Sequence, residues 1–124
     1  MSLKLLVVTG GRNYHLTDGN YRLLATLNPM MLYAGDATGA DKDAIEWAKR
    51  THRIWERFIA NWTELDLAAG PIRNGIMLKA ALQEAKPYLP LLLAFPGNKG
   101  TRNCINQAEK LGIPHIPLGW NPHA

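Results

Sequence analysis

Short apolar runs alternate with segments of helical periodicity from one end of this chain to the other. The apolar runs cover residues 3–9, 31–34, 54–59, 88–95 and 113–117, and helical spacing marks 19–27, 40–52, 72–86 and 101–111. Strands that alternate with helices are typical of βα units around a parallel sheet. Two of the runs are apolar almost throughout, as expected for parallel strands that helices cover on both faces. The sequence therefore predicts an α/β domain with a mostly parallel sheet of about five strands.

The length of 124 residues is sufficient for one domain with a sizeable core. We expect a single domain over residues 1–118 and a short C-terminal tail over 119–124. The one cysteine, Cys104, excludes an intrachain disulfide framework, and no spacing of Cys and His resembles a zinc site. No apolar run has the length of a signal peptide or a membrane span. We therefore expect a cytoplasmic protein that needs no metal and does not bind a membrane.

Glycine, arginine and aspartate gather where the predicted strands end. The segments are Thr9-Gly10-Gly11-Arg12, Gly35-Asp36-Ala37-Thr38-Gly39-Ala40-Asp41, Gly70-Pro71-Ile72-Arg73-Asn74 and Pro96-Gly97-Asn98-Lys99-Gly100-Thr101. In a parallel sheet such segments meet at one edge, where ligands bind. Backbone N–H groups at a helix start lack partners and attract anions, and glycine lets an anion approach the backbone. The loops predict a site for a phosphorylated ligand, although none is a Walker motif or a Gly-x-Gly-x-x-Gly dinucleotide motif.

Three arginines, Arg12, Arg73 and Arg102, lie beside these loops. Arg73 and Arg102 fall in the first turn of their predicted helices, where the helix dipole disfavours a cation by about 0.3 to 1 kcal/mol. Because a bound anion removes that cost, we expect the three side chains to converge on a phosphate; the alternative is that each is solvated at the surface. The net charge of +4 and the pI near 9.4 favour an anionic partner, without choosing between a small ligand and nucleic acid.

Two aspartates and a tryptophan are further candidates for ligand contact. Asp36 follows a strand directly, where a carboxylate can accept hydrogen bonds from ribose hydroxyls. Asp41 either contacts the ligand or stabilises the start of the helix that follows. Trp62 follows a strand and either stacks on a base or packs. Cys104 is expected to be a small buried apolar residue, and the dispersed histidines are given no chemistry.

Together these motifs resemble the SLOG superfamily, which joins the Lonely Guy phosphoribohydrolases and the Smf/DprA DNA-processing proteins, and especially its small YspA-like branch. The resemblance rests on Val8-Thr9-Gly10-Gly11-Arg12, on 35–41 with Ala44 and Trp47-Ala48, on Asn61-Trp62, on 70–74 with Met77, and on Ala94-Phe95-Pro96-Gly97 with Gly100-Thr101. It implies a Rossmann-like three-layer sandwich that binds a nucleotide or nucleotide-derived ligand, often as a homodimer. The branch is common in bacteria and their phages.

The resemblance and the strand-exit loops together define the expected ligand-binding residues. By similarity, the phosphate lies against Gly10, Gly11, Arg12, Gly97, Gly100 and Thr101. The whole expected set is Thr9, Gly10, Gly11, Arg12, Gly35, Asp36, Gly39, Asp41, Trp62, Arg73, Asn74, Pro96, Gly97, Asn98, Lys99, Gly100 and Thr101.

The chain departs from the Lonely Guy motif Pro-Gly-Gly-x-Gly-Thr-x-x-Glu at two positions. Asn98 replaces the second glycine, and Cys104 stands where the catalytic glutamate is expected. A thiol cannot replace a carboxylate that stabilises an oxocarbenium-like transition state, so no catalytic residue is assigned with certainty.

Three functions follow from the sequence. The leading hypothesis is a nucleotide-binding protein that acts as a sensor, carrier or sequestering protein and requires no cofactor. The alternative is an N-glycosidic hydrolase of nucleoside monophosphates or ADP-ribose-like ligands, in which Asp36 or Asp41 supplies the carboxylate. The third is single-stranded DNA binding like that of DprA, which ranks last because the sequence has no stripe of interleaved basic and aromatic residues.

Overall fold

The five strands of this protein all run in the same direction, in the order β3-β2-β1-β4-β5. The computed structural model describes residues 3–62 and 66–119 of the chain. Its elements are β1 (Leu3–Thr9), α1 (Asp18–Leu27), β2 (Pro29–Ala34), α2 (Ala40–Arg50), β3 (Ile54–Arg57), η1 (Asp66–Ala68), α4 (Ala69–Ala85), β4 (Leu91–Ala94), α5 (Lys99–Lys110) and β5 (His115–Pro117). The predicted α/β class and the parallel five-stranded sheet are confirmed.

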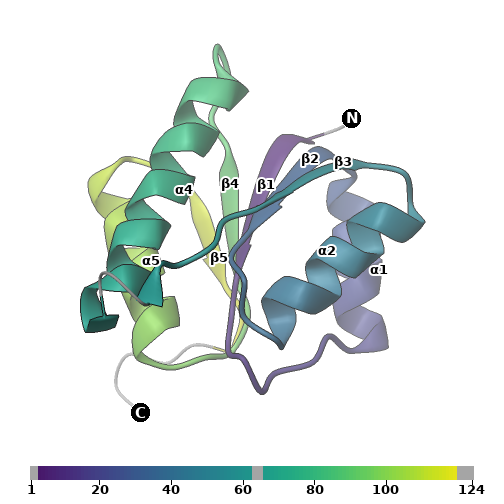
Figure 1. Cartoon of the computed structure of the whole chain (residues 1–124). Coiled ribbons are helices and arrows are strands. Elements are labelled where there is room, and N and C mark those ends of the chain that lie inside the picture. Colours follow the sequence, from purple (N-terminus) through teal and green to yellow (C-terminus); the bar gives the residue numbers. More distant parts are fainter. Residues whose placement is uncertain (1–2, 63–65, 120–124) are drawn as a thin grey trace.

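Helices cover both faces of the sheet, which makes three layers (Figure 1). Helices α1 and α2 lie on one face, and α4 and α5 lie on the other. Side chains alternate between these faces along β1, because successive residues of a strand point in opposite directions. Leu6 and Val8 pack with the α1–α2 layer, whereas Leu5 and Val7 pack with the α4–α5 layer. The Rossmann-like three-layer sandwich is therefore present.

Two helices begin two or three residues earlier than the apolar periodicity predicts, and α1 begins one residue earlier. Helix α4 begins at Ala69 rather than at residue 72, since Pro71 falls in the first turn, where its missing N–H is not needed. Helix α5 begins at Lys99 rather than at residue 101. Arg73 is consequently the fifth residue of α4, and Arg102 is the fourth residue of α5. Arg73 therefore lies beyond the first turn of α4, contrary to expectation, whereas Arg102 lies at the end of the first turn of α5, where Lys99 is the first residue.

Strand boundaries also differ from the expected ranges. Strand β4 begins at Leu91 rather than at residue 88, because Pro87 and Pro90 have no N–H to donate to a neighbouring strand. Strand β3 ends at Arg57 rather than at residue 59 and lies at an edge of the sheet, where all four of its residues are exposed. Arg57 and Ile59 therefore stand at the exit of an edge strand.

One expectation lies mostly outside the described residues. The expected tail, 119–124, falls almost entirely there, since only Gly119 of it is described.

Over 3–62 and 66–119, none of the helices combines the length and the apolar character that crossing a membrane requires.

Candidate functional site

The loops that follow β1 and β4 are neighbours at the carboxyl edge of the sheet, where doubly wound sheets bind their ligands. Here the two loops pack backbone against backbone. The Gly11 N–H donates to the Pro96 carbonyl at 2.8 Å. A β-carbon on Gly10 would lie 2.6 Å from the Ala40 Cβ and 2.9 Å from the Phe95 Cβ. Close packing alone thus accounts for the glycine pair that the sequence suggested for phosphate.

The start of α2 is built onto the β1 loop in the same way. The Ala40 N–H donates to the Gly11 carbonyl at 3.2 Å, and the Thr38 hydroxyl donates to the Arg12 carbonyl at 3.0 Å. A β-carbon on Gly39 would collide with the backbone of Gly11 and Arg12. Arg12 and Asn13 remain exposed at this loop.

The start of α5 is more open. Asn98, Lys99 and Gly100 are exposed, and a β-carbon on Gly100 would meet no atom within 4 Å. The α5 N-cap, Asn98, makes no side-chain capping bond, so the first N–H groups of α5 are not capped by that side chain. Thr101 is buried, and its hydroxyl lies directly against Gly97. The open part of this expected phosphate loop is therefore its middle, residues 98–100.

Arg73 holds together the exits of β2 and β3. Its Nη1 donates to Asp36 Oδ1 at 2.7 Å and to the Phe58 carbonyl at 3.2 Å. Asp36 Oδ2 in turn accepts the Ala60 N–H at 3.2 Å. The Arg73 Nε donates to Asn74 Oδ1 at 3.0 Å, and the buried Asn74 amide donates to the Gly100 carbonyl on α5 at 3.3 Å. Arg73 thus neutralises Asp36 within the protein, and an anion at Arg73 would compete with that carboxylate.

Asp41 is buried beside this network, with only 4% of its surface exposed. Its Oδ2 accepts the Ala37 N–H at 3.3 Å, whereas its Oδ1 has no hydrogen-bond partner among the described residues. Burial raises the pKa of the Asp41 carboxyl to about 7; Arg73 and the Ala37 N–H oppose the rise, and Asp36 adds to it. A β-carbon on Gly35 would lie 2.8 Å from Asp41 Oδ2 and would collide with the Arg73 guanidinium. Gly35 therefore provides the space in which these side chains meet.

Cys104 lies on the same network from the α5 side. It is fully buried, and burial raises the pKa of its thiol to about 12, against a hydrogen bond with the Thr9 side chain that lowers it. Such a thiol is not a nucleophile at neutral pH. The expectation that Cys104 is a small buried apolar residue is confirmed.

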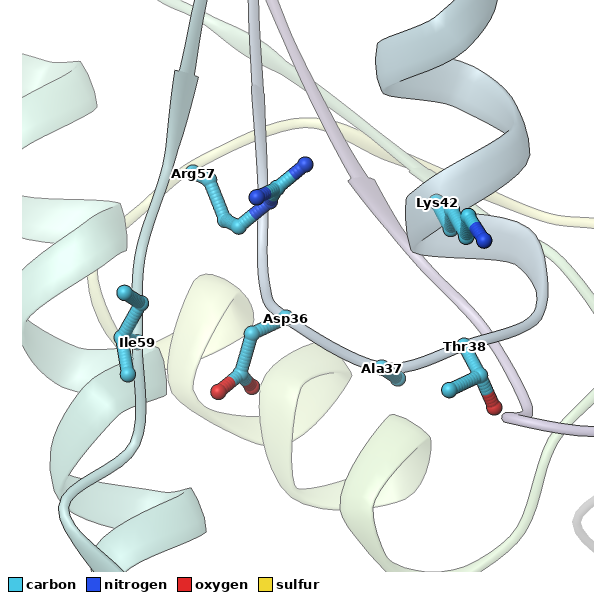
Figure 2. A pocket seen from close by; sticks show the side chains of 6 residues that line it. All are labelled: Asp36, Ala37, Thr38, Lys42, Arg57 and Ile59. Carbon is cyan, nitrogen blue, oxygen red and sulfur yellow. The ribbon is translucent and has the colours of Figure 1, made fainter.

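A pocket of about 320 Å³ opens between the exits of β2 and β3. We call it the β2–β3 pocket; it is lined by Asp36, Ala37, Thr38, Lys42, Arg57 and Ile59 (Figure 2). In Figure 2 the charged ends of Lys42 and Arg57 lie on one side of the loop 36–38, and the Asp36 carboxylate points to the other side. Over the described ranges, no ion pair holds Lys42 or Arg57. Since Arg73 neutralises Asp36, the two cations set the charge of the pocket.

None of the three expected arginines lines the β2–β3 pocket. Sequence reasoning missed the pocket residues Ala37, Thr38, Lys42, Arg57 and Ile59 as contacts. The charge-placement argument, applied to α2, whose start at Ala40 was predicted correctly, would have found Lys42 in the first helical turn. Arg57 was not predicted as a ligand contact because the predicted strand, 54–59, extended past it and placed it inside the sheet rather than at the strand exit.

Trp62 lies away from the β2–β3 pocket lining. It is 55% exposed, and its ring lies next to Gly70 at the start of α4. A β-carbon on Gly70 would lie 3.3 Å from that ring. Base stacking on Trp62 stays a prediction.

The described residues contain no group of three or more His, Cys, Asp or Glu side chains arranged to hold a metal ion. No model of a known protein family matches the chain. A curated relative, the Gene 61 protein of Mycobacterium phage D29, is 33% identical over 100 residues, which cover 75% of this chain and 74% of that protein. The name of the relative states no activity, so the comparison shows that the two proteins are related and indicates no ligand or reaction.

Proposed function

We propose that this chain, which belongs to the same family as the Gene 61 protein of Mycobacterium phage D29, binds a nucleotide or nucleotide-derived small molecule at the carboxyl edge of its sheet. The observation that supports this function is the β2–β3 pocket, whose two cations, Lys42 and Arg57, have no carboxylate partner in the described part of the chain. Pockets that hold small ligands measure about 300 to 1,000 Å³, and parallel sheets bind them at this edge. The phosphate of the ligand sits between Lys42 and Arg57.

The magnitudes agree with a moderate affinity. Hydrogen bonds to charged groups contribute about 1.5 to 3 kcal/mol each, so the two cations together supply at most about 3 to 6 kcal/mol, because both side chains are exposed and water screens their charge. A dissociation constant of about 1 μM corresponds to about 8 kcal/mol. The remainder comes from the sugar and base, for which Ile59 offers an exposed apolar wall and the loop 36–38 offers polar groups.

Calorimetry with 5′-mononucleotides, cyclic mononucleotides and ADP-ribose tests this function. The double variant K42A/R57A is expected to bind the preferred ligand at least tenfold more weakly than the wild type. K79A/K110A is the matched control, because it removes the same charge from two exposed lysines on α4 and α5. The proposal fails if the wild type binds no member of the panel, or if both double variants lose affinity equally.

The hydrolase alternative receives no such support. Asp36 is neutralised by Arg73, and Asp41 Oδ1 is buried away from the solvent. Release of free base from nucleoside monophosphates, lost in both Asp36→Asn and Asp41→Asn, is the result that would favour it.

One observation favours single-stranded nucleic acid as a second candidate ligand. Trp55 on the edge strand β3 is 38% exposed and lies beside two cations, Lys49 Nζ at 4.8 Å and Arg57 Cζ at 5.8 Å from its ring centre. The sequence did not show this cluster because Lys49 comes from α2. Base stacking on an exposed aromatic contributes about 1 to 3 kcal/mol per base. Fluorescence anisotropy of a labelled oligonucleotide is expected to show binding that weakens steeply with salt and at least fivefold in Trp55→Ala; an affinity that Trp55→Ala leaves unchanged excludes this surface.

Homodimer formation is also part of the proposal. Ile72 and Ile76 are exposed one turn apart on α4, and exposed apolar patches often mark protein interfaces. Light scattering coupled to size exclusion is expected to give twice the chain mass, and I72D/I76D is expected to give the mass of a single chain. A single-chain mass for the wild type contradicts it.

A further inference from the structure

Arg73 lies between two carboxylates and pairs with only one of them. Its Nη1 lies 2.7 Å from Asp36 Oδ1, and no ion pair joins it to Asp41. Yet Arg73 Nη1 and Asp41 Oδ2 border the same small space above Gly35, which a β-carbon there would fill. Asp41 is therefore a second carboxylate beside the Arg73 guanidinium.

One carboxylate oxygen of Asp41, Oδ1, lacks a hydrogen-bond partner among the described residues. Buried polar atoms are nearly always hydrogen-bonded, and leaving one unpaired costs about 1 to 3 kcal/mol, more for a charged group. Asp41 Oδ1 is fully buried and unpaired among the described residues. The groups that face Asp41 are Arg73 from α4, Asp36 and the Ala37 N–H from the loop after β2, and the neutral Cys104 thiol from α5. Arg73 is the one cation in this set.

We propose that Arg73 exchanges its carboxylate partner, pairing with Asp36 in the structure described here and with Asp41 when the β2–β3 pocket is occupied. The exchange gives the buried Asp41 carboxylate a cationic partner and releases Asp36 from its ion pair. Asp36 already lines the pocket, and once released from Arg73 its carboxylate is free to turn from the far side of the loop 36–38 (Figure 2) and accept hydrogen bonds from the ligand.

This assigns Asp36 as the residue that selects ligands by their hydroxyl groups. A carboxylate accepts hydrogen bonds through both oxygens and donates none, which suits two neighbouring hydroxyls such as those of a ribose. The ligand class is therefore a phosphorylated sugar or nucleotide with a vicinal diol. This step, and the occupation of the pocket that drives the exchange, rest on the proposed function, whereas the capacity of Arg73 to pair with either carboxylate does not.

Side-chain NMR of the protein without ligand tests the exchange. In Asp36→Asn, Arg73 loses its charged partner and moves to Asp41, which lowers the pKa of Asp41. The ¹³C carboxyl signal of Asp41 measures this pKa. The fall caused by Asp36→Asn is expected to be at least one unit larger in the wild-type background than in an Arg73→Gln background. The Arg73 Nε signal of Asp36→Asn is expected to titrate together with Asp41, a readout that needs no change at Arg73. Equal falls in both backgrounds, or an Arg73 signal that ignores the titration of Asp41, would overturn the proposal.

Calorimetry tests the selection of hydroxyl groups separately. Adenosine 5′-monophosphate is expected to bind Asp41→Asn at least fivefold more weakly than the wild type, because Arg73 then has no second partner and keeps Asp36 occupied. The 2′,3′-dideoxy analogue is expected to bind both proteins equally. If Asp41→Asn weakens the binding of both ligands equally, Asp36 does not select ligands by their hydroxyl groups. If neither ligand binds the wild type, the proposed function fails, while the NMR result still decides whether Arg73 can pair with either carboxylate.

Discussion

Replacing Asp41 with asparagine is expected to make the protein more stable, and more so as the pH rises. In the folded state burial raises the pKa of Asp41 from 3.8 to about 7. Between these values the folded protein binds a proton that the unfolded chain has released. The stability that this protonated group contributes is therefore fully present below about pH 4 and is lost as the pH rises to about 7. At about 1.36 kcal/mol for each pKa unit, the loss amounts to about 4 kcal/mol.

Urea unfolding at pH 4.5, 5.5, 6.5 and 7.5 measures this effect as a difference between two proteins. The free energy of unfolding of Asp41→Asn, minus that of the wild type, is expected to increase by about 3 to 4 kcal/mol across this range, since asparagine carries no charge to bury. Taking the difference cancels the titration of the other carboxylates. Asp18→Asn, at the exposed start of α1, is the control and is expected to change by less than about 1 kcal/mol. A difference for Asp41→Asn that does not vary with pH would refute the reasoning.

Two further predictions concern the packing beneath the carboxyl edge. Gly35→Ala places a β-carbon on the Arg73 guanidinium and is expected to lower the free energy of unfolding by about 2 kcal/mol or more, as the charged hydrogen bond to Asp36 is lost. Gly100→Ala, where a β-carbon meets no atom within 4 Å, is expected to leave stability unchanged or raise it by up to about 1 kcal/mol; equal thermal shifts in the two variants would contradict this. Cys104 is expected to resist an aromatic disulfide reagent at pH 8 and to react at once in urea, because its thiol is fully buried with a pKa of about 12; rapid reaction of the folded protein would show that the α5 packing opens.

The fold could be predicted from the sequence because the apolar residues change between strand and helix periodicity at each element. Boundaries were less accurate where proline decides them, since Pro71 is tolerated inside the first turn of α4, whereas Pro87 and Pro90 delay β4. Neither effect changes the order of the elements, so the parallel sheet was still predicted correctly.

The site was predicted only in part, since strand order is not visible along the sequence. The loops after β1 to β4 were expected at one edge, and the structure has them there. That β3 occupies the edge of the sheet, and so presents Arg57 beside Lys42, follows only from the tertiary arrangement. The same holds for Arg73, whose partner Asp36 lies 37 positions away in the sequence. Because of this ion pair, an arginine that was expected to bind phosphate instead connects two parts of the protein.

Mapping the amide signals of ¹⁵N-labelled protein during titration with adenosine 5′-monophosphate tests the central claim most directly. The largest shifts are expected at Ala37, Thr38, Lys42, Arg57 and Ile59, the residues that surround the cationic pocket after β2 and β3. Shifts confined to residues 10–12 and 97–101 would move the ligand to the loops after β1 and β4, and an unchanged spectrum at millimolar nucleotide would contradict nucleotide binding altogether.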